Sequence, residues 1–129
     1  MLDSVSCDRE GDNVGPIDKL AVQTAIEKFV GQDVYLHLET TNGAYAAHRG
    51  DNSMAVCAYI RNGKIRFERG SIQGDGPYRV GLKMDGGWTY AEGLTDWEID
   101  GEGRLLLAGN DSEGRLAVAL ELSTTPFPM

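Results

Sequence analysis

The two histidines of the chain and one nearby glutamate have the types and spacing expected of a metal site. Asn42-Gly43 separates two segments of alternating polarity. Asn-Gly is the strongest short-range signal for a β-hairpin, because both turn residues must adopt positive φ. In the register that this turn predicts, His37 stands directly opposite His48, with Glu39 in diagonal reach on the same face. Two imidazoles and a carboxylate resemble the ligand set of non-haem iron sites and some zinc sites. The pattern therefore predicts a divalent-metal site at these three residues.

A competing interpretation of the same hairpin needs no metal. A hairpin that packs one face on the core leaves its other face in water, and two histidines can fall opposite each other there by chance. The usual behaviour of half-solvated hairpins favours this interpretation. If the sheet closes into a barrel, the polar cluster could instead line a cavity.

Residues 74–100 hold both tryptophans and show the alternation of a strand with one buried face. A three-residue loop at Asp85-Gly86-Gly87, with Gly87 left-handed, would set Met84 opposite Trp88. That register assigns most of the large side chains to the core face. The aromatic residues that could otherwise stack on a sugar or a nucleobase are Tyr78, Trp88, Tyr90 and Trp97. We expect core packing for most of them.

No nucleophile is paired with a base at a recognisable spacing. Cys57 lies on an apolar alternating segment, where a free cysteine is more often part of the packing. The loop at residues 74–77 precedes a strand rather than a helix, so it lacks the helix dipole of a phosphate loop. We therefore assign no catalytic residue and no cofactor other than the hypothetical metal, and the sequence favours a protein that is not an enzyme.

The composition is that of one folded domain with many tight turns. The chain has 129 residues, 41% of them hydrophobic, which is enough for a core without disulfides. The net charge of −8 argues against nucleic acid or an anionic membrane as partner. The two cysteines share no motif spacing and no secretory signal opens the chain, so we expect a cytoplasmic protein.

One helix is expected near residues 17–30. Pro16 suits its first turn, Asp18 suits its positive end, and Gly31 suits its C-terminal stop. Its apolar residues recur at helical spacing, so one face should pack on a sheet, beside the small residues of the last strand.

From Asp33 onward the segments predict strands that are joined by hairpins. The turn signals are Asn42-Gly43, Asn62-Gly63, Asp85-Gly86-Gly87, residues 101–103 and residues 110–114. Consecutive hairpins give an antiparallel meander of about eight to nine short strands, which forms a barrel or a two-layer sandwich. We expect residues 1–15 to be a flexible acidic tail and residues 16–129 to be a single globular β-rich domain.

Three long runs are specific enough to carry a resemblance: VYLHLETTNGAYAAH, AYIRNGKI and GPYRVGLKMDGGWTYAEGLT. They resemble the YojF-type family of small bacterial proteins of unknown function, over the stretch from Ile17 to Phe127. The resemblance implies a cytoplasmic, mostly β single domain without assigned catalytic residues. Members that resemble this chain are often encoded beside a deacetylase of the bacillithiol pathway, which implies an accessory or partner role.

Three functional hypotheses follow. The favoured one is a non-catalytic accessory or interaction protein, and an exposed apolar patch would support it. The second is a small-ligand-binding β-barrel, which a lined cavity would support. The third is a metal-dependent enzyme that uses His37, Glu39 and His48. A meander that does not close has open edges, so we also predict a homodimer.

Overall fold

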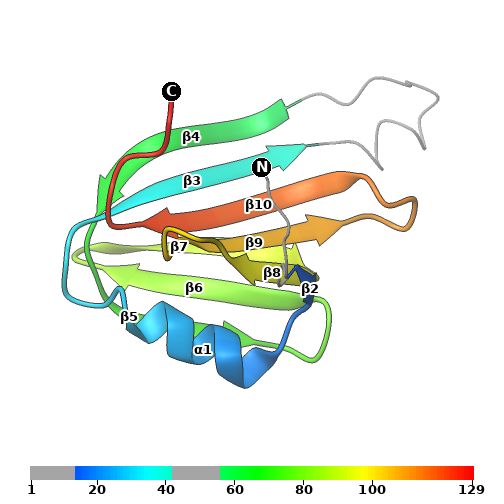
Figure 1. Cartoon of the computed structure of the whole chain (residues 1–129), viewed down its shortest axis with the longest axis horizontal. Helices are drawn as coiled ribbons and strands as arrows, with labels where there is room; N and C mark the ends of the chain where they lie inside the picture. The colour runs from blue at the N-terminus through cyan, green and yellow to red at the C-terminus, as the bar shows by residue number, and fades with distance from the viewer. Residues whose placement is uncertain (1–13, 42–55) are drawn as a thin grey trace.

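The computed structural model describes residues 14–41 and 56–129, with Val56 and Cys57 described by their backbone alone. These residues form one helix and nine strands in two antiparallel sheets (Figure 1). The elements are β2 (Gly15–Pro16), α1 (Lys19–Glu27), β3 (Val34–Thr41), β4 (Val56–Ile65), β5 (Phe67–Gln73), β6 (Tyr78–Met84), β7 (Gly87–Leu94), β8 (Asp96–Ile99), β9 (Leu105–Asn110) and β10 (Leu116–Ser123). The mainly β fold class is confirmed, as a sandwich rather than a closed barrel.

The order of strands in the larger sheet departs from the order in the chain. The six-stranded sheet has the order β2-β8-β9-β10-β3-β4, and the three-stranded sheet has the order β5-β6-β7. Two meanders, β5 to β7 and β8 to β10, follow the chain. Strand β3 does not, because it lies between β10 and β4. The single continuous meander expected from the turn signals is therefore wrong, because the chain changes sheet after β4 and again after β7, and β3 pairs with β10 as well as with β4.

The hairpin predicted at Asn42-Gly43 is wrong in its register. His37 of β3 pairs with Arg61 of β4 on one side and with Glu121 of β10 on the other. A strand has two edges only, and at His37 both are occupied by described strands, β4 and β10. The predicted partner, His48, lies outside the described residues.

Asn62-Gly63 is a bulge and not the predicted turn. Strand β4 runs through both residues, and Asn62 is the extra residue between the pairs Leu36–Gly63 and His37–Arg61. Asn62 has a φ of 58°, so the positive φ that made Asn-Gly a turn signal is present. A bulge needs the same backbone conformation, which is why sequence alone did not separate the two.

The turn between β6 and β7 is shorter by one residue than predicted. Met84 pairs with Gly87, and Gly86 takes the positive φ, 85°, that we expected at Gly87. A one-residue slip moves every side chain of a strand to the other face. Trp88 and Tyr90 therefore lie on the outer face, 41% and 48% exposed, and their assignment to the core is wrong. The hairpin turns predicted at residues 101–103 and 110–114 are confirmed.

Helix α1 is shorter than expected but is capped where the sequence indicated. The Asp18 side chain accepts a hydrogen bond from the Ala21 backbone at 3.2 Å. The helix packs against β5 rather than beside the small residues of β10. At Gly70 of β5 a Cβ would come within 2.6 Å of the Ile26 side chain, so this glycine permits the close approach. Gly15, which we expected in the tail, is part of β2 and pairs with Trp97 of β8.

One apolar core lies between the sheets and under the helix. It contains Val22, Ile26, Val34, Leu36, Phe67, Val80, Leu82, Leu94, Leu105, Leu107, Leu120 and Leu122, all of them at most 2% exposed. Burying one such side chain stabilises the fold by roughly 1.5–3 kcal/mol. Strand alternation then directs the intervening polar residues to the outer face of each sheet. No helix in the described part of the chain is long and apolar enough to cross a membrane.

Candidate functional site

A row of side chains, most of them charged or polar, crosses the outer face of the six-stranded sheet. Pairing places His37 between Arg61 and Glu121. The row continues from Glu121 through Leu106 to Glu98. Because neighbouring residues in each strand face the core, this row faces away from it. Tertiary pairing thus gathers polar side chains that lie up to about two thirds of the chain length apart in sequence.

Residues 124–129, which we call the strap, run from the end of β10 across β3 toward β4 (Figure 1). The Asn62 carboxamide accepts a hydrogen bond from the Phe127 backbone N–H at 2.7 Å and donates one to the Phe127 carbonyl at 3.0 Å. Arg61 donates to the Pro128 carbonyl at 2.7 Å. Phe127 is 4% exposed, whereas every other strap residue is exposed. The strap is therefore held mainly by its backbone and by one buried side chain, and the Asn62 carboxamide also donates to the Met129 sulfur at 3.2 Å.

The Phe127 ring is buried among basic side chains. The guanidinium carbons of Arg61 and Arg104 lie 4.9 and 5.6 Å from the ring centre. The His37 ring lies edge-on at 6.3 Å. Cation–π attraction is worth about 0.5–1 kcal/mol at exposed sites and about 2 kcal/mol when the partners are desolvated. Here the ring is buried and the two arginines are partly exposed, so the contribution lies between these limits.

His37 is 6% exposed, and both of its ring nitrogens have partners. Arg61 Nη1 lies 3.2 Å from Nδ1, and Glu39 Oε1 lies 3.2 Å from Nε2. A guanidinium can only donate, so Nδ1 accepts and Nε2 carries the hydrogen that is donated to Glu39. This arrangement holds the imidazole ring in one orientation between Arg61 and Glu39.

A pocket of about 750 Å³ lies beside the strap on this face, and we call it the outer-face pocket. Its lining residues come from β4, β8, β9, β10, the loop at residues 100–104 and the strap: Arg61, Glu98, Asp100, Gly101, Glu102, Arg104, Leu106, Glu121, Phe127 and Pro128. Basic, acidic and aromatic groups thus meet at one cavity.

Asp100 organises the loop that forms one wall of the outer-face pocket. Its carboxylate accepts hydrogen bonds from the backbone N–H groups of Glu102 and Arg104, each at 2.9 Å. It also pairs with the Arg104 guanidinium at 2.6 Å. Burial acts to raise the pKa of Asp100, but these hydrogen bonds outweigh it and hold the pKa below the usual value. The ionised carboxylate therefore fixes Arg104 over the Phe127 ring.

Glu121 is in a different electrostatic position from Asp100. Burial raises the pKa of the Glu121 carboxyl, and the basic side chains around it oppose that effect only in part. Within the described residues its carboxylate accepts no hydrogen bond. Glu121 is thus the acidic wall residue with the greatest need of a partner.

The predicted metal site is brought together only in part. His37 and Glu39 do contact each other, as expected, but the third ligand, His48, lies outside the described residues. Within the described ranges, no group of three or more His, Cys, Asp or Glu side chains is placed to hold a metal ion. The register that placed the two histidines opposite each other is wrong, because His37 pairs with Arg61 and Glu121. A metal at His37, Glu39 and His48 stays a prediction, which elemental analysis can test.

The outer face of the three-stranded sheet carries a second cluster, which we call the arginine–aromatic face. Trp88 and Tyr90 stack in parallel, with ring centres 5.4 Å apart and planes at 6°. Arg69 lies 5.6 Å from the Trp88 ring, and Arg79 lies 5.4 Å from the Tyr90 ring. Two cations thus flank a stacked pair that remains open to solvent.

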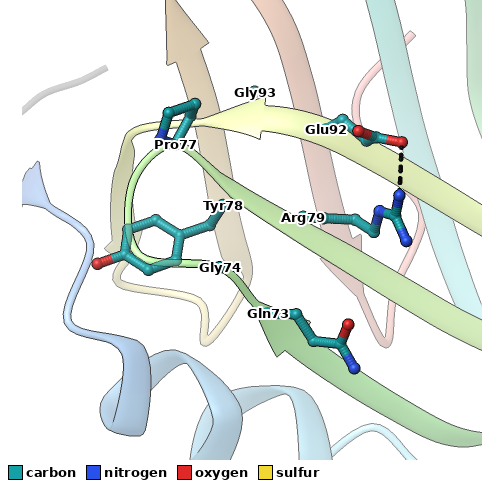
Figure 2. Close-up of a pocket in the computed structure, with 7 residues that line it drawn as sticks. All are labelled: Gln73, Gly74, Pro77, Tyr78, Arg79, Glu92 and Gly93. Carbon is teal, nitrogen blue, oxygen red and sulfur yellow. Dashed lines mark ion pairs between the residues drawn. The ribbon is translucent and has the colours of Figure 1, made fainter.

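A smaller pocket of about 300 Å³ adjoins this face (Figure 2). Arg79 of β6 and Glu92 of β7 form an ion pair across its wall at 3.2 Å, and the Gln73 side chain of β5 lies opposite. The Tyr78 ring points the other way, toward α1. Both charges of the ion pair are satisfied, so the chemical case for this pocket is weaker than for the outer-face pocket.

Sequence reasoning missed four residues that shape the outer-face pocket: Arg61, Arg104, Glu121 and Phe127. They are distributed over half the chain, so no spacing pattern joins them. One local signal was available, because Glu121 is a lone charge in the otherwise apolar segment from Leu116 to Leu122. A charge in a strand that reaches the middle of a sheet is a reason to look for a polar cluster.

The comparisons with known proteins agree on one family. Residues 16–127 match the model of a family described as "Protein of unknown function (DUF1806)". The chain is 50% identical over 111 residues to the "Uncharacterized protein YojF" of Bacillus subtilis (strain 168), which covers 86% of this chain and 96% of that protein. The crystal structure of the Bacillus subtilis YojF protein superposes with a TM-score of 0.78 at 44% identity. It covers 91% of this chain and 99% of that one.

Proposed function

The chain belongs to the DUF1806 family of proteins of unknown function, and we propose that it is a non-catalytic accessory protein that binds a small polar ligand in the outer-face pocket. The observation that carries this proposal is the half-buried Glu121 carboxylate, without a hydrogen bond from the described residues, at the wall of a cavity of about 750 Å³. Cavities of that size are typical of small-molecule sites.

The charges of the wall define the class of ligand. Four carboxylates and two guanidiniums line the outer-face pocket. Both guanidiniums already have partners, since Arg104 pairs with Asp100 and Arg61 bonds the strap. A ligand that carries a primary amine would supply N–H donors to Glu121 and add positive charge to that of the nearby basic side chains, which offset its burial only in part. The proposed ligand is therefore a small organic amine.

Calorimetry with paired probes tests this proposal. Each probe amine, for example 1,4-diaminobutane, is compared with the alcohol of the same skeleton. We expect the amine to bind and the alcohol not to bind. Glu121→Gln should weaken amine binding by at least about tenfold, because a hydrogen bond to a charged group is lost. Glu92→Gln, on the other sheet, is the matched control and should bind like the wild type.

Two results would contradict the ligand proposal. One is equal binding of amine and alcohol, and the other is an unchanged affinity in the Glu121→Gln variant. The non-catalytic part has its own test, because NMR of a bound amine after prolonged incubation should show no new product.

A second candidate function, an interaction protein, is favoured by the arginine–aromatic face. Trp, Tyr and Arg are the residue types that dominate binding energy at protein interfaces. The face carries Arg69, Arg79 and Lys83 against Glu68 and Glu92, in a chain of net charge −8. Its local positive charge suits an acidic protein surface.

The partner to test first at the arginine–aromatic face is the bacillithiol-pathway deacetylase that the family resemblance implies. We expect a complex by gel filtration that Trp88→Ala abolishes and Trp97→Phe, a change in the core, leaves intact. Co-elution that survives Trp88→Ala would exclude this face as the docking surface.

The homodimer predicted from open sheet edges stays a proposal. Among the described strands, β2 and β4 are the edges of the larger sheet, and β5 and β7 are the edges of the smaller one. Such edges have unpaired backbone groups that a second copy could cover. Sedimentation equilibrium should give twice the 14.0 kDa mass of the chain, and a monomer mass at micromolar concentration would reject the dimer.

A further inference from the structure

The strap is bound to the outer face of the larger sheet as a docked peptide is bound to a receptor. Its backbone is recognised at three points, by Asn62 at both polar groups of Phe127 and by Arg61 at Pro128. One side chain, Phe127, is buried, and the flanking residues are exposed. Backbone bonds and a single anchored aromatic ring are the elements of extended-peptide recognition.

The sequence of the strap fits this mode of binding. Pro126 and Pro128 flank Phe127, and proline has no backbone N–H. The N–H of Phe127 is therefore the one backbone donor of the Pro-Phe-Pro triplet, and Asn62 takes it. Two prolines also hold the segment extended before it docks, which lowers the conformational entropy lost on binding.

The receptor side is prepared by the bulge in β4. Asn62 has a φ of 58°, and the bulge turns its carboxamide toward the strap instead of leaving it in the regular alternation of the strand. Arg61, directly before it, reaches both the Phe127 ring and the Pro128 carbonyl. Arg104 and His37 complete the site around the ring. We call these four residues the strap groove.

We propose that the strap groove is a recognition site for an extended segment of a partner protein that carries an aromatic residue between prolines, bound in exchange for the strap. The strap shows which chemistry fits. It also acts as an internal competitor, at an effective concentration on the order of millimolar. The outer-face pocket borders Phe127 and Pro128, so a longer segment has room to continue there. This proposal concerns a peptide and stands whether or not the pocket binds an amine.

The test uses the full chain with Phe127→Ala, which removes the internal competitor's anchor. The probe is a fluorescent peptide with the strap sequence, Thr-Thr-Pro-Phe-Pro-Met, and the control peptide has alanine in place of phenylalanine. Fluorescence anisotropy should show binding of the first peptide and about thirtyfold weaker binding of the second, the loss expected of an anchor residue. Wild-type protein should bind the probe more weakly than the variant, because its own strap competes.

A second substitution tests the receptor side. Asn62→Gly keeps the positive φ of the bulge, which glycine adopts freely, and removes the carboxamide. Added to Phe127→Ala, it should weaken peptide binding by about tenfold through the loss of two hydrogen bonds. Circular dichroism melting of each variant establishes that it is folded.

A measurement on wild-type protein keeps the proposal open to refutation if Phe127→Ala does not fold. In ¹⁵N-labelled protein, millimolar unlabelled peptide should shift the Phe127 amide signal toward the position of an undocked chain. The alanine peptide should leave the signal in place. Three results would each overturn the proposal: a Phe127 amide signal that does not shift, the absence of peptide binding, or equal binding of the two peptides.

Discussion

The outer faces of the two sheets use the same interaction in opposite settings. On the larger sheet, Phe127 lies beside two guanidinium groups and is 4% exposed. On the smaller sheet, Trp88 and Tyr90 also lie beside two guanidinium groups but are 41% and 48% exposed. The difference is that a segment of the chain covers one face, while no described residue covers the other in the same way.

This difference shows that the exposure of a cation–π contact to solvent, more than the two residue types, decides how much the contact contributes to stability. The contact is worth roughly 0.5–1 kcal/mol at an exposed site and about 2 kcal/mol when it is desolvated. We therefore expect the larger-sheet contact to contribute more to stability than the smaller-sheet contact, and the smaller-sheet rings to be accessible to a partner without displacement of any described segment.

The largest expected effect is on Phe127. Phe127→Ala should lower the free energy of unfolding by about 3 kcal/mol, because a buried ring and its cation–π contacts are lost. Trp88→Ala should lower it by less than about 1 kcal/mol, since nearly half of that ring is in water. Urea denaturation of both variants measures the comparison. Equal losses would mean that the two faces do not differ as described.

The next effect compares two loops of the same local sequence, Asp-x-Glu-Gly-Arg. Asp100 borders the outer-face pocket, and Asp111, at the other end of β9, repeats its hydrogen bonds to backbone and arginine. Asp100→Asn should cost about 1 kcal/mol, the low end for charged hydrogen bonds near solvent. It should also perturb amine binding. Asp111→Asn should destabilise the loop and leave binding unchanged.

Acid titration sharpens the loop comparison. The Arg115 backbone hydrogen bond is the main cause of the lowered pKa of Asp111, and the hydrogen bonds of its own loop lower the pKa of Asp100. A lowered folded-state pKa gives stability that is present above the usual value of 3.8 and is lost as pH falls through the folded pKa. The gap between wild type and either Asn variant should therefore be full at neutral pH and close on acidification. A gap independent of pH would contradict the assignment.

Glu121 should show the opposite pH dependence and a smaller effect. Its pKa is raised by burial, so its stabilising contribution is fully present below the usual value of 4.5 and is lost as pH rises through the folded pKa. Gln resembles the protonated carboxyl at all pH values. Glu121→Gln should therefore gain stability relative to wild type as pH rises above the usual value of 4.5, as urea denaturation at a series of pH values would show. A relative loss over that range would mean that the basic neighbours outweigh burial.

The smallest effect is expected at Gly81, under the stacked rings of the smaller sheet. A Cβ there would lie 2.8 Å from the Tyr90 ring, which is half-exposed, so the ring can shift toward solvent at the expense of its stacking on Trp88. Gly81→Ala should change stability by less than about 0.5 kcal/mol and should alter the near-ultraviolet circular dichroism of the Trp88–Tyr90 pair. Gly70→Ala is the contrasting control. The added methyl group there meets the buried Ile26, so a clear destabilisation is expected.

Local features of the fold were predictable because their causes are local. Asp18 caps the helix because its side chain reaches a backbone N–H three residues away. The hairpins at residues 101–103 and 110–114 form because one aspartate in each satisfies the backbone of its own loop. Such interactions join residues that are only a few positions apart, so they can be predicted from the sequence alone.

The errors occurred where one local conformation serves two topologies. Asn62 has the positive φ that the sequence indicated, but the strand continues and the residue forms a bulge. At the β6–β7 turn, a shift of one residue moved Trp88 from the predicted core face to the outer face. Turn chemistry fixes a backbone angle, whereas register depends on which partner strand is available.

The sequence by itself determined the class of fold, the capped helix, the aspartate loops and the alternation that divides core from surface. It did so because these follow from backbone conformation and from interactions between near neighbours. Only the tertiary structure decided that β3 lies between β10 and β4. That placement pairs His37 with Arg61 and Glu121. It also brings the strap within reach of β4, where the Phe127 backbone bonds to Asn62. The physical reason is that strand pairing joins segments at any sequence distance, and the choice among partners is made by burial of the whole sheet.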